Sequence, residues 1–495
     1  FIVMVLPEEY KEHMKELLGG EYESFISIYD DDRERSYGLR KNLLKYNSDD
    51  FDKIIGLKLE KVSWASEGYY YDPAERPGKN ALHEAGAYYI QEPSAMCAVP
   101  LLDPKPGEFV CDLCAAPGGK STQTAGRMGR LGLLVSNEII KNRADILSSN
   151  IERMGVSNCV VTNEDPKTMA AMFSCFFDKV LVDAPCSGEG MFRKEENAVS
   201  EWSIDNVHMC AERQRMILDC ASKMVRPGGS IVYSTCTFEP EEDEQAAADF
   251  IKSHPDWKIV SDSVRIWPHH ARGEGHFAVR FVKDGVLTER TDIYGDINRD
   301  VHGDINGDVQ KKNQQDFGRN VNRIYACKKK KEVRGKVPAA NRACMILNDV
   351  CTKNATDEIR SNHIFTDFGG NIYAVPAGMT DMSGLSVKRP GLQIVMTDDK
   401  GKNTRLMPAH ALAMYLRPDE AKKSYDMNDI EAVRFLNGES LQADIERLKA
   451  GLSGSCSDGW ILMTYRGFST GWGKKTGNII KNHYPKGLRR DVSKI

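Results

Sequence analysis

The segment EFVCDLCAAPGGKSTQTAGRM, residues 108–128, decides the fold of the central part of this chain. Its first part is a short apolar run typical of a buried strand, and its last part has the pattern of a helix. Between them, Gly118 and Gly119 allow a tight turn and a close approach of backbone to ligand, directly before a helix start with free N–H groups. This order predicts a cradle for a nucleotide-like cofactor.

Strand-like and helix-like segments alternate along the sequence that follows. The further strand-like segments are GLLVSN (132–137), CVVTN (159–163), DKVLVDAP (178–185) and GSIVYST (229–235). Such alternation predicts a parallel sheet with crossover helices, which is a doubly wound α/β fold. Because these folds bind ligands at the carboxyl ends of their strands, the residues after each strand are the candidates for a site.

The first three strand ends carry a set of residues that fits S-adenosylmethionine. The glycine turn is neither GxGxxG nor a complete Walker loop, since Cys114 stands where that loop begins with glycine. Glu138 follows the second strand at the place where an acid binds two ribose hydroxyls. Asp165 follows the third strand and can accept a hydrogen bond from an exocyclic amine. Either acid alone would usually be a surface residue, but together with the turn they predict a cofactor site.

The next two strand ends carry thiols. Asp183 and Cys186 follow the fourth strand, and Cys236 follows the fifth. Free cysteines are usually small buried hydrophobes, which is our interpretation for most of the thirteen in this chain. That interpretation fits Cys186 and Cys236 poorly, because both end apolar runs at the edge where the fold binds ligands. We therefore expect the two thiols to face one site.

Length and composition set the broad class of the protein. At about 150 residues per domain, 495 residues predict roughly three domains. The 41% hydrophobic and 28% charged residues are those of a globular chain and exclude collagenous, wholly disordered and disulfide-rich classes. No apolar run reaches a membrane-spanning length and no secretory signal is recognisable, so we expect a cytoplasmic protein with reduced cysteines and no membrane contact.

Two weak metal patterns do not lead to a metal prediction. Cys111 and Cys114 have CxxC spacing without a second pair, and Asp304, Asn306 and Asp308 lack the glycine and glutamate that complete an EF-hand loop. We expect no metal.

The charge is divided unevenly along the chain. Residues 321–495 hold 29 Lys+Arg and 18 Asp+Glu, a net +11, whereas residues 1–320 have a net charge of −15. A basic C-terminal part predicts a module that binds a polyanion, with a solvated basic tail as the alternative. The charge is concentrated within residues 461–495, in Lys474, Lys475, Lys481, Lys486, Arg489 and Arg490, among Trp472, His483 and Tyr484.

These motifs resemble those of a known family, the RNA cytosine-C5 methyltransferases, and in particular their bacterial ribosomal RNA branch, called RsmF-like. The most specific matches are CAAPGGK (114–120), DAPCSGEG (183–190) and STCTF (234–238), in this order. Weaker matches are LRKN (39–42), EAGAYYIQEPSAM (84–96), GEGHFAVRF (273–281) and GWGKKTGNIIKNHYPKGLR (471–489).

The resemblance implies a Rossmann-like, S-adenosylmethionine-dependent methyltransferase core with a small N-terminal module and C-terminal PUA-like RNA-binding modules. It implies that Cys236 is the nucleophile and that Cys186 helps release the product. It also implies that Asp183 holds the base edge at N3 or N4 and that Lys120 helps to orient the pocket. The cofactor-binding residues that it implies are Cys114, Ala115, Ala116, Pro117, Gly118, Gly119, Lys120, Glu138, Asp165 and Asp183.

The organisation expected along the chain has five parts. The parts are an N-terminal RNA-binding-type module at 1–75, the methyltransferase domain at 76–285, a flexible linker at 286–335, a first C-terminal module at 336–417 and a basic PUA-like module at 418–495. We expect the whole protein to act as a monomer.

The function implied by the resemblance is methylation of cytosine C5 in RNA, with 16S ribosomal RNA as the expected substrate and S-adenosylmethionine as cofactor. A thiolate adds to C6 so that C5 can attack a methyl group, and the base must be unstacked to be reached. Transfer RNA is an alternative substrate, and an idle RNA-binding assembly factor is an alternative of another class. A DNA cytosine methyltransferase would use the Pro185-Cys186 thiol as nucleophile, and the presence of Cys236 argues for the RNA type.

Overall fold

The computed structural model describes residues 5–29, 35–45, 51–260, 263–288, 337–379, 381–400, 403–450 and 457–489. The chain forms two compact units. One contains residues 1–129, 134–154 and 163–287, and the other contains 130–133, 155–162 and 288–495. The linker expected at 286–335 lies, from residue 289 on, outside the described residues.

The N-terminal part of the first unit combines short helices with a small sheet. Helix α1 (Glu8–Leu18) buries Tyr10 and Met14, and α2 (Tyr22–Ile26) buries Phe25. The sheet has the order β2-β3-β1-β4. It extends past the boundary expected at residue 75, because β4 pairs with β1. The bounds are β1 (Gly38–Lys41), α3 (Phe51–Ile55), β2 (Leu59–Lys61), β3 (Gly68–Tyr71), α4 (Ala81–Glu84) and β4 (Tyr88–Ile90).

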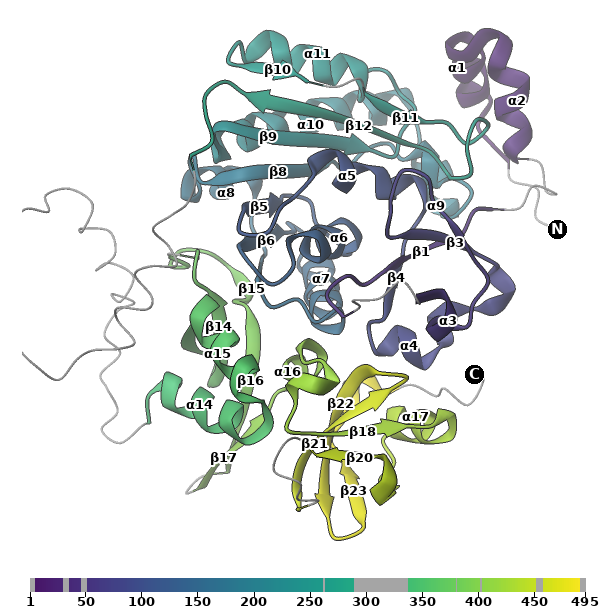
Figure 1. Ribbon diagram of the computed structural model, residues 1–495. Coiled ribbons are helices and arrows are strands. Elements are labelled where there is room, and N and C mark those ends of the chain that lie inside the picture. The colour runs from purple at the N-terminus through teal and green to yellow at the C-terminus, as the bar shows by residue number, and fades with distance from the viewer. Residues whose placement is uncertain are drawn as a thin grey trace, which may run out of the picture. The chain divides into compact units, whose positions relative to one another are not determined.

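The central sheet has the strand order β10-β12-β9-β8-β5-β6-β7-β15, with β11 beside β12. Figure 1 shows the part from β10 to β6. Strands β5, β8 and β9 run parallel, whereas β12 is antiparallel to β9. This confirms the α/β prediction. The bounds are β5 (Phe109–Asp112), β6 (Leu133–Asn137), β7 (Cys159–Thr162), β8 (Phe177–Asp183), β9 (Val225–Thr235), β10 (Trp257–Ile259), β11 (Val264–Ile266) and β12 (His276–Lys283).

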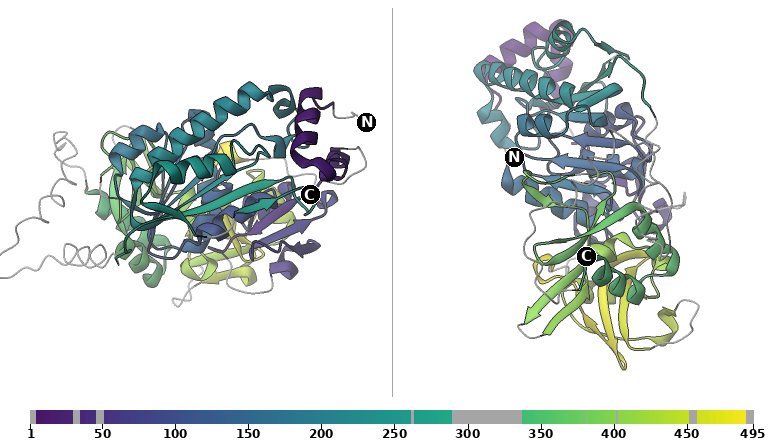
Figure 2. Two further views of the ribbon diagram at one scale, coloured as in Figure 1. Left: turned by 90° about the horizontal axis from the view of Figure 1, so that it is seen from above. Right: turned by 90° about the vertical axis from the view of Figure 1, so that its left-hand side faces the viewer.

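Helices cover both faces of this sheet. Helix α10 packs on β8 and β9 with α8 and α11 beside it, and α5 packs on β9 and β12 with α6 beside it. Figure 2 shows the long teal helices α10 and α11 on the same face. The crossovers therefore leave the carboxyl ends of β5, β6, β8 and β9 at one edge. The bounds are α5 (Ala98–Leu102), α6 (Gly119–Met128), α7 (Lys141–Arg153), α8 (Pro166–Met172), α9 (Glu196–Glu201), α10 (Ile204–Met224) and α11 (Glu244–Ser253).

The second unit contains two sheets, with the orders β13-β14-β16-β17 and β19-β23-β22-β21-β18-β20. One hydrophobic cluster joins Leu347 and Leu412 with Leu462 and Trp472, so the two C-terminal modules expected from the sequence share a core. The bounds are α14 (Ala339–Val350), α15 (Lys353–Asn362), β13 (His363–Phe368), β14 (Asn371–Pro376), β15 (Val387–Arg389), β16 (Leu392–Lys400), β17 (Asn403–Pro408), α16 (His410–Tyr415), β18 (Lys423–Met427), α17 (Asp429–Leu436), β19 (Leu441–Gln442), β20 (Leu448–Ala450), β21 (Gly459–Tyr465), β22 (Phe468–Thr476) and β23 (Ile479–Asn482).

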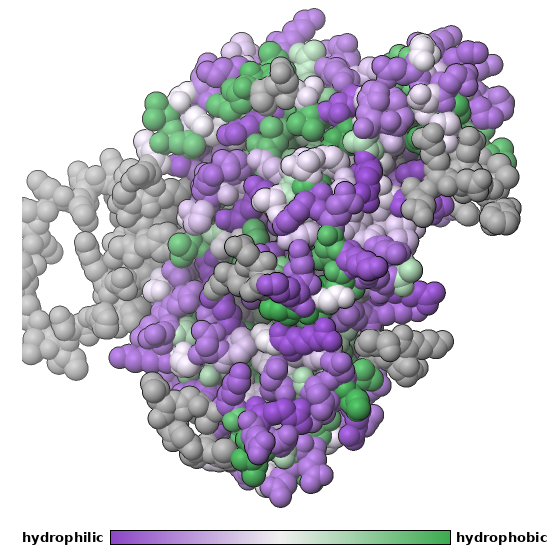
Figure 3. Space-filling view, turned by 45° about the vertical axis from the view of Figure 1, so that its right-hand side comes forward, coloured by the Kyte–Doolittle hydropathy of each residue, from purple (hydrophilic) through white to green (hydrophobic). Residues whose placement is uncertain are grey.

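On the face that Figure 3 shows, the described surface is mostly hydrophilic, with small scattered hydrophobic patches. Within the part of the chain that the structure describes, every helix is too short or too polar to cross a membrane.

Candidate active site

The loop after β5 turns sharply into α6. Gly118 has φ 112°, a left-handed conformation that favours glycine, and the Ala116–Pro117 peptide bond is cis. A Cβ atom on Gly118 would lie 3.2 Å from Leu147 Cδ1, which leaves little space for a side chain. The turn expected at Gly118 and Gly119 is present, directly before the first residues of α6.

Side chains hold this loop from several directions. Arg143 donates a hydrogen bond to the Ala116 carbonyl at 3.0 Å, and Asn150 donates to the Pro117 carbonyl at 2.9 Å. Ser121, in the first turn of α6, donates to Asp112 Oδ2 at 2.7 Å. The loop is therefore fixed relative to β5 and α7.

Arg40 on β1 also holds the loop. Its side chain donates to Gln91 Oε1 at 2.5 Å, to the Gly119 carbonyl at 2.7 Å and to Thr122 Oγ1 at 2.9 Å. Arg40 is only 2% exposed, and burial lowers its pKa to about 10, so it remains charged at neutral pH. The sequence analysis missed Arg40 as a site residue, although the LRKN segment that contains it was noted.

The two acids expected to bind the cofactor follow β6 and β7. Glu138 is 3% exposed, accepts a hydrogen bond from the Ile140 amide at 2.8 Å and lies 3.6 Å from Arg143. Asp165 is exposed and caps α8 by accepting from the Lys167 amide at 2.7 Å. Asn137 joins the two strand ends, since its side chain donates to the Glu164 carbonyl at 2.9 Å.

Asp112 at the end of β5 presents an unpartnered oxygen. Its Oδ1 is buried without a hydrogen-bond partner among the described residues. Burial raises the pKa of Asp112 to about 7 in spite of the hydrogen bond from Ser121. A cationic ligand beside this carboxyl would compensate the cost of burying it, so the donor set fits a cofactor that carries a positive charge.

The two thiols expected to face one site lie side by side. Cys186 Sγ and Cys236 Sγ are 3.4 Å apart, and both residues are half-buried. The pairing of β8 with β9 explains this, because Asp183 lies opposite Ser234 in the parallel register. The contact with the Cys236 sulfur, together with burial, raises the pKa of Cys186 well above its ordinary value. Cys186 is therefore a protonated thiol at neutral pH.

Lys120 and Asp183 form an ion pair near the thiols. Lys120 Nζ lies 2.8 Å from Asp183 Oδ1, which also accepts a hydrogen bond from Ser234 at 2.9 Å. Burial opposes the charge of both groups, but their mutual attraction outweighs it, so the pKa of Lys120 is raised and that of Asp183 is lowered. Both groups are charged at neutral pH.

His276, at the start of β12, faces the same pair and was also missed from the sequence. Its Nε2 lies 3.8 Å from Asp183 Oδ1, and the side chain is 2% exposed. Burial, supported by the charge of Lys120, lowers its pKa to about 3, so the imidazole is neutral. The charged pair is therefore covered by an uncharged ring.

One cluster of possible metal ligands occurs among the described residues, and the sequence analysis did not single it out. It consists of Glu21, His269 and His270, and each histidine Nε2 lies 3.0 Å from Glu21 Oε2. His269 Nδ1 is buried and has no described hydrogen-bond partner, whereas a metal-bound histidine normally donates from this second nitrogen. We interpret the cluster as two His–Glu pairs.

The basic C-terminal residues divide into two groups. Lys481, Lys486 and Arg489 are exposed, whereas Lys475 is 8% exposed and pairs with Asp458 at 3.4 Å. Trp472 and Tyr484 are buried in the core, and Arg490 lies outside the described residues. Strands β22 and β23 occupy residues 468–476 and 479–482, so these lysines lie on a folded module, and their binding of a polyanion stays a prediction.

The fold and the loop at the end of β5 define a Rossmann-like, S-adenosylmethionine-dependent methyltransferase with PUA-like C-terminal modules. Family models cover most of the chain. They are the N-terminal domain of 16S rRNA methyltransferase RsmF (residues 6–93), 16S rRNA methyltransferase RsmB/F (99–282), the RsmF rRNA methyltransferase first C-terminal domain (352–416) and the methyltransferase RsmF PUA domain (422–490).

Known proteins agree with these models. Ribosomal RNA small subunit methyltransferase F of Shewanella baltica (strain OS195) is 30% identical, over 95% of this chain and 93% of the relative. The same-named protein of Enterobacter sp. (strain 638) is 28% identical, over 98% and 96%. This chain belongs to the family of ribosomal RNA small subunit methyltransferase F.

Solved structures share the fold of slightly more than half of the chain. A methyltransferase homolog protein from Pyrococcus horikoshii has a TM-score of 0.50 at 27% identity, over 55% of this chain and 93% of that one. NSun6 from Pyrococcus horikoshii with SFG has a TM-score of 0.51 at 22% identity, over 58% and 100%.

Proposed function

We propose that this protein methylates C5 of cytosine in 16S ribosomal RNA through a covalent bond between Cys236 and C6 of the base. The observation that carries the proposal is the pair of sulfurs 3.4 Å apart, beside a buried Lys–Asp ion pair. The names of the relatives favour ribosomal RNA over transfer RNA. The presence of both thiols and of Asp183 and Lys120 argues against an idle assembly factor.

Cys236 is the nucleophile in this proposal. Its thiolate adds to C6, so a C–S bond forms and the electron pair of the C5–C6 double bond moves toward C5 and the ring. S-adenosylmethionine, when bound, supplies an electrophilic methyl group for C5. After the C5 proton is lost, elimination breaks the C6–S bond, restores the C5–C6 double bond and releases Cys236 as a thiolate.

Cys186 assists the release. Before elimination, C5 must lose its hydrogen as a proton, and a base must lie near Cys236 to accept it. The sulfur of Cys186 lies 3.4 Å from that of Cys236, so it is close enough to act as this base. It can accept the C5 proton after its own proton has passed to solvent. Without it, the RNA would remain attached to the enzyme.

Asp183 and Lys120 bind the cytosine edge. An ionised carboxylate accepts a hydrogen bond from the N4 amino group of cytosine, whereas the O4 atom of uracil would be repelled. The ammonium of Lys120 stabilises negative charge that develops on the ring when the thiolate adds. The pair therefore favours cytosine and lowers the barrier to addition.

S-adenosylmethionine is held by the loop Cys114–Lys120 with Glu138, Asp165 and Asp183. The support is the left-handed turn at Gly118, the buried carboxylate of Glu138 and the unpartnered oxygen of Asp112. Small residues at Ala115 and Ala116 leave space next to the backbone.

Replacing Glu138 by alanine is expected to weaken S-adenosylmethionine binding about ten- to hundredfold. The loss of a charge-assisted hydrogen-bond partner costs about 1.5–3 kcal/mol. Isothermal calorimetry measures the affinity, and Asp145→Ala, an exposed acid on α7, is the control. Unchanged affinity in Glu138→Ala would remove Glu138 from the cofactor site.

Replacing Lys481 and Lys486 by glutamine is expected to weaken RNA binding and to flatten its salt dependence. Each lost phosphate contact reduces the slope of log affinity against log salt by roughly 0.7–0.9. Deleting residues 461–495 is a poorer test, because it removes β22, β23 and most of β21. Filter binding of 16S RNA at several salt concentrations measures the slope, with the exposed Lys252→Gln as control. An unchanged slope would assign these lysines to the solvated surface.

A further inference from the structure

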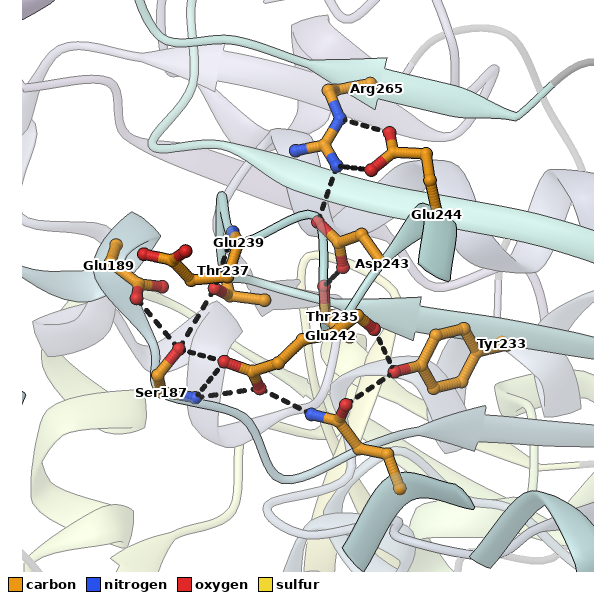
Figure 4. A network of polar contacts seen from close by, with 11 residues as sticks. Ser187, Glu189, Tyr233, Thr235, Thr237, Glu239, Glu242, Asp243, Glu244 and Arg265 are labelled. Carbon is orange, nitrogen blue, oxygen red and sulfur yellow. Dashed lines mark hydrogen bonds and ion pairs between the residues drawn. The ribbon is translucent and has the colours of Figure 1, made fainter. Parts of the chain in front are cut away.

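A buried acidic network includes the residues that follow the two cysteines in the sequence (Figure 4). Ser187 follows Cys186 and Thr237 follows Cys236, and the hydroxyl oxygens of these two residues are 3.0 Å apart. Around them lie the carboxyl groups of Glu189, Glu239 and Glu242, which are 1%, 2% and 0% exposed. The proposed mechanism uses none of these acids.

Glu242 and Glu189 both contact the hydroxyl of Ser187. Glu242 accepts from Gln214 Nε2 at 2.5 Å and from the Ser187 amide at 3.2 Å, and its Oε1 is in close contact with Ser187 Oγ. Glu189 Oε1 lies 2.8 Å from the same Ser187 Oγ and accepts from Trp202 Nε1 at 2.7 Å. One hydroxyl group therefore lies between two carboxyl groups.

Counting hydrogens shows that this arrangement needs an additional proton. A serine hydroxyl has one hydrogen, and an ionised carboxylate can only accept hydrogen bonds. If Ser187 donates to one carboxylate, its contact with the other is favourable only when that carboxyl group is protonated and donates to Ser187. Glu189 Oε2 is moreover buried without a described partner, which disfavours an ionised Glu189.

The surrounding charges do not neutralise two carboxylates. The described basic side chains of the network contact other acids, since His13 lies 2.7 Å from Glu239 and Arg265 lies 2.8 Å from Asp243. Burial, followed by the charge of Glu189, raises the pKa of Glu242 to about 8. Other titratable groups also face the pair. They are Tyr10 and His13 from α1, Tyr29 from the turn after α2, Cys210 from α10, Tyr233 from β9, and Cys186, Glu239 and Asp243 from the two loops.

We propose that Glu189 and Glu242 are positioning residues that share one proton through Ser187, and that this proton joins the loop of Cys186 to the loop of Cys236. When the shared proton passes to solvent at alkaline pH, two negative carboxylates face one hydroxyl hydrogen. The segment that follows Cys186 is then repelled from Glu242, and the two sulfurs are no longer held together. The effect on product release rests on the proposed function, whereas the placement of the thiols does not.

An aryl arsenoxide tests the placement of the thiols without RNA. It binds two nearby thiols at once, forming two As–S bonds while its oxygen leaves as water with the two thiol hydrogens. The full-length protein is titrated between pH 6.5 and 9.5, and the signal of Cys186→Ala is subtracted to remove binding by other cysteines. Glu242→Gln supplies an amide hydrogen in place of the proton and cannot ionise.

We expect Glu242→Gln and the wild type to bind the arsenoxide equally at pH 7. Because one pH unit above a pKa leaves about a tenth of a group protonated, the ratio of variant to wild type should rise about tenfold by pH 9. Because the charge of Glu242 also raises the pKa of Cys186, the thiols are titrated separately in both proteins and the contribution of their ionisation is divided out of the ratio. If Glu242→Gln does not fold, Glu189→Gln replaces it, and the same rise in the ratio of arsenoxide binding is expected. The control Glu241→Gln changes a half-buried neighbour with 33% side-chain exposure and should follow the wild type.

A flat ratio across this pH range, or a rise of the same size in Glu241→Gln, would overturn the proposal. Release of methylated RNA, measured over the same pH range, should show the same alkaline loss in the wild type and rescue in Glu242→Gln. If no methyl transfer occurs while the arsenoxide ratio rises, the proposed function is wrong and the proton-sharing pair stands.

Discussion

Replacing Cys236 by alanine is expected to abolish methyl transfer and to prevent any covalent complex with RNA. Removing the nucleophile of a covalent mechanism lowers the rate by more than about 10⁴-fold, because the remaining groups cannot activate C5. Transfer of radiolabelled methyl groups from S-adenosylmethionine to 16S RNA measures the first effect. A shifted band in a denaturing gel measures the second.

Cys186→Ala is expected to fail at a later step. It should add to C6 and methylate once, and then remain attached to the RNA because no base removes the C5 proton. The denaturing gel should therefore show a stable complex that carries label. Cys220→Ala, a buried cysteine of α10, is the control and should behave as the wild type.

The opposite pattern would contradict this assignment of the two thiols. A complex that accumulates in Cys236→Ala and disappears in Cys186→Ala would make Cys186 the nucleophile, as in the DNA cytosine enzymes. The sulfurs are close enough for either to reach the same ring carbon, so the experiment decides between two chemically reasonable orders.

Asp183→Asn is expected to lower the rate of methyl transfer about 10²- to 10³-fold, the usual cost of removing a group that stabilises charge in a reaction. The asparagine amide no longer balances Lys120 and can present a donor to N4 of cytosine. The measurement is single-turnover methylation with saturating cofactor, which separates chemistry from binding. Cofactor affinity is measured in parallel, because Asp183 also belongs to the proposed cofactor site.

Asp219→Asn is the matched control for Asp183→Asn, since Asp219 is a half-buried acid of α10 that pairs with Lys223. Retention of wild-type single-turnover rates in Asp183→Asn would show that the ion pair with Lys120 is structural. The pair would then stabilise the end of β8 and would not contact the base.

The sequence predicts the main layout of the candidate site because parallel strands place their carboxyl ends at one edge. Cys186 and Cys236 each follow an apolar strand, and this rule predicts that their side chains lie close together. The glycine turn at Gly118 and the acid at Glu138 follow from the same rule. The register of β8 and β9, which brings the sulfurs to 3.4 Å, could not be predicted, since it depends on packing against α10.

Other features depend on distant contacts that leave no local pattern. Glu239 and Glu242 lie in the run EPEEDE, whose composition indicates a solvated helix start, yet both are buried. His276 occurs at the beginning of a strand that packs beside β9, and its neighbour Asp183 is far away in sequence. Trp472 and Tyr484 stand among lysines, which suggested RNA contact, but both are part of the core.

Arg40 makes the methyltransferase core dependent on a segment that precedes it in the chain. Its guanidinium crosses from β1 to the carbonyl of Gly119 and to Thr122. A truncation that removes β1 would leave the Gly119 carbonyl and the Thr122 hydroxyl without these hydrogen bonds and would loosen the glycine turn. A methyltransferase domain expressed without β1 would therefore bind its cofactor poorly. Swapping catalytic domains between relatives therefore requires transplanting β1 and its arginine with them.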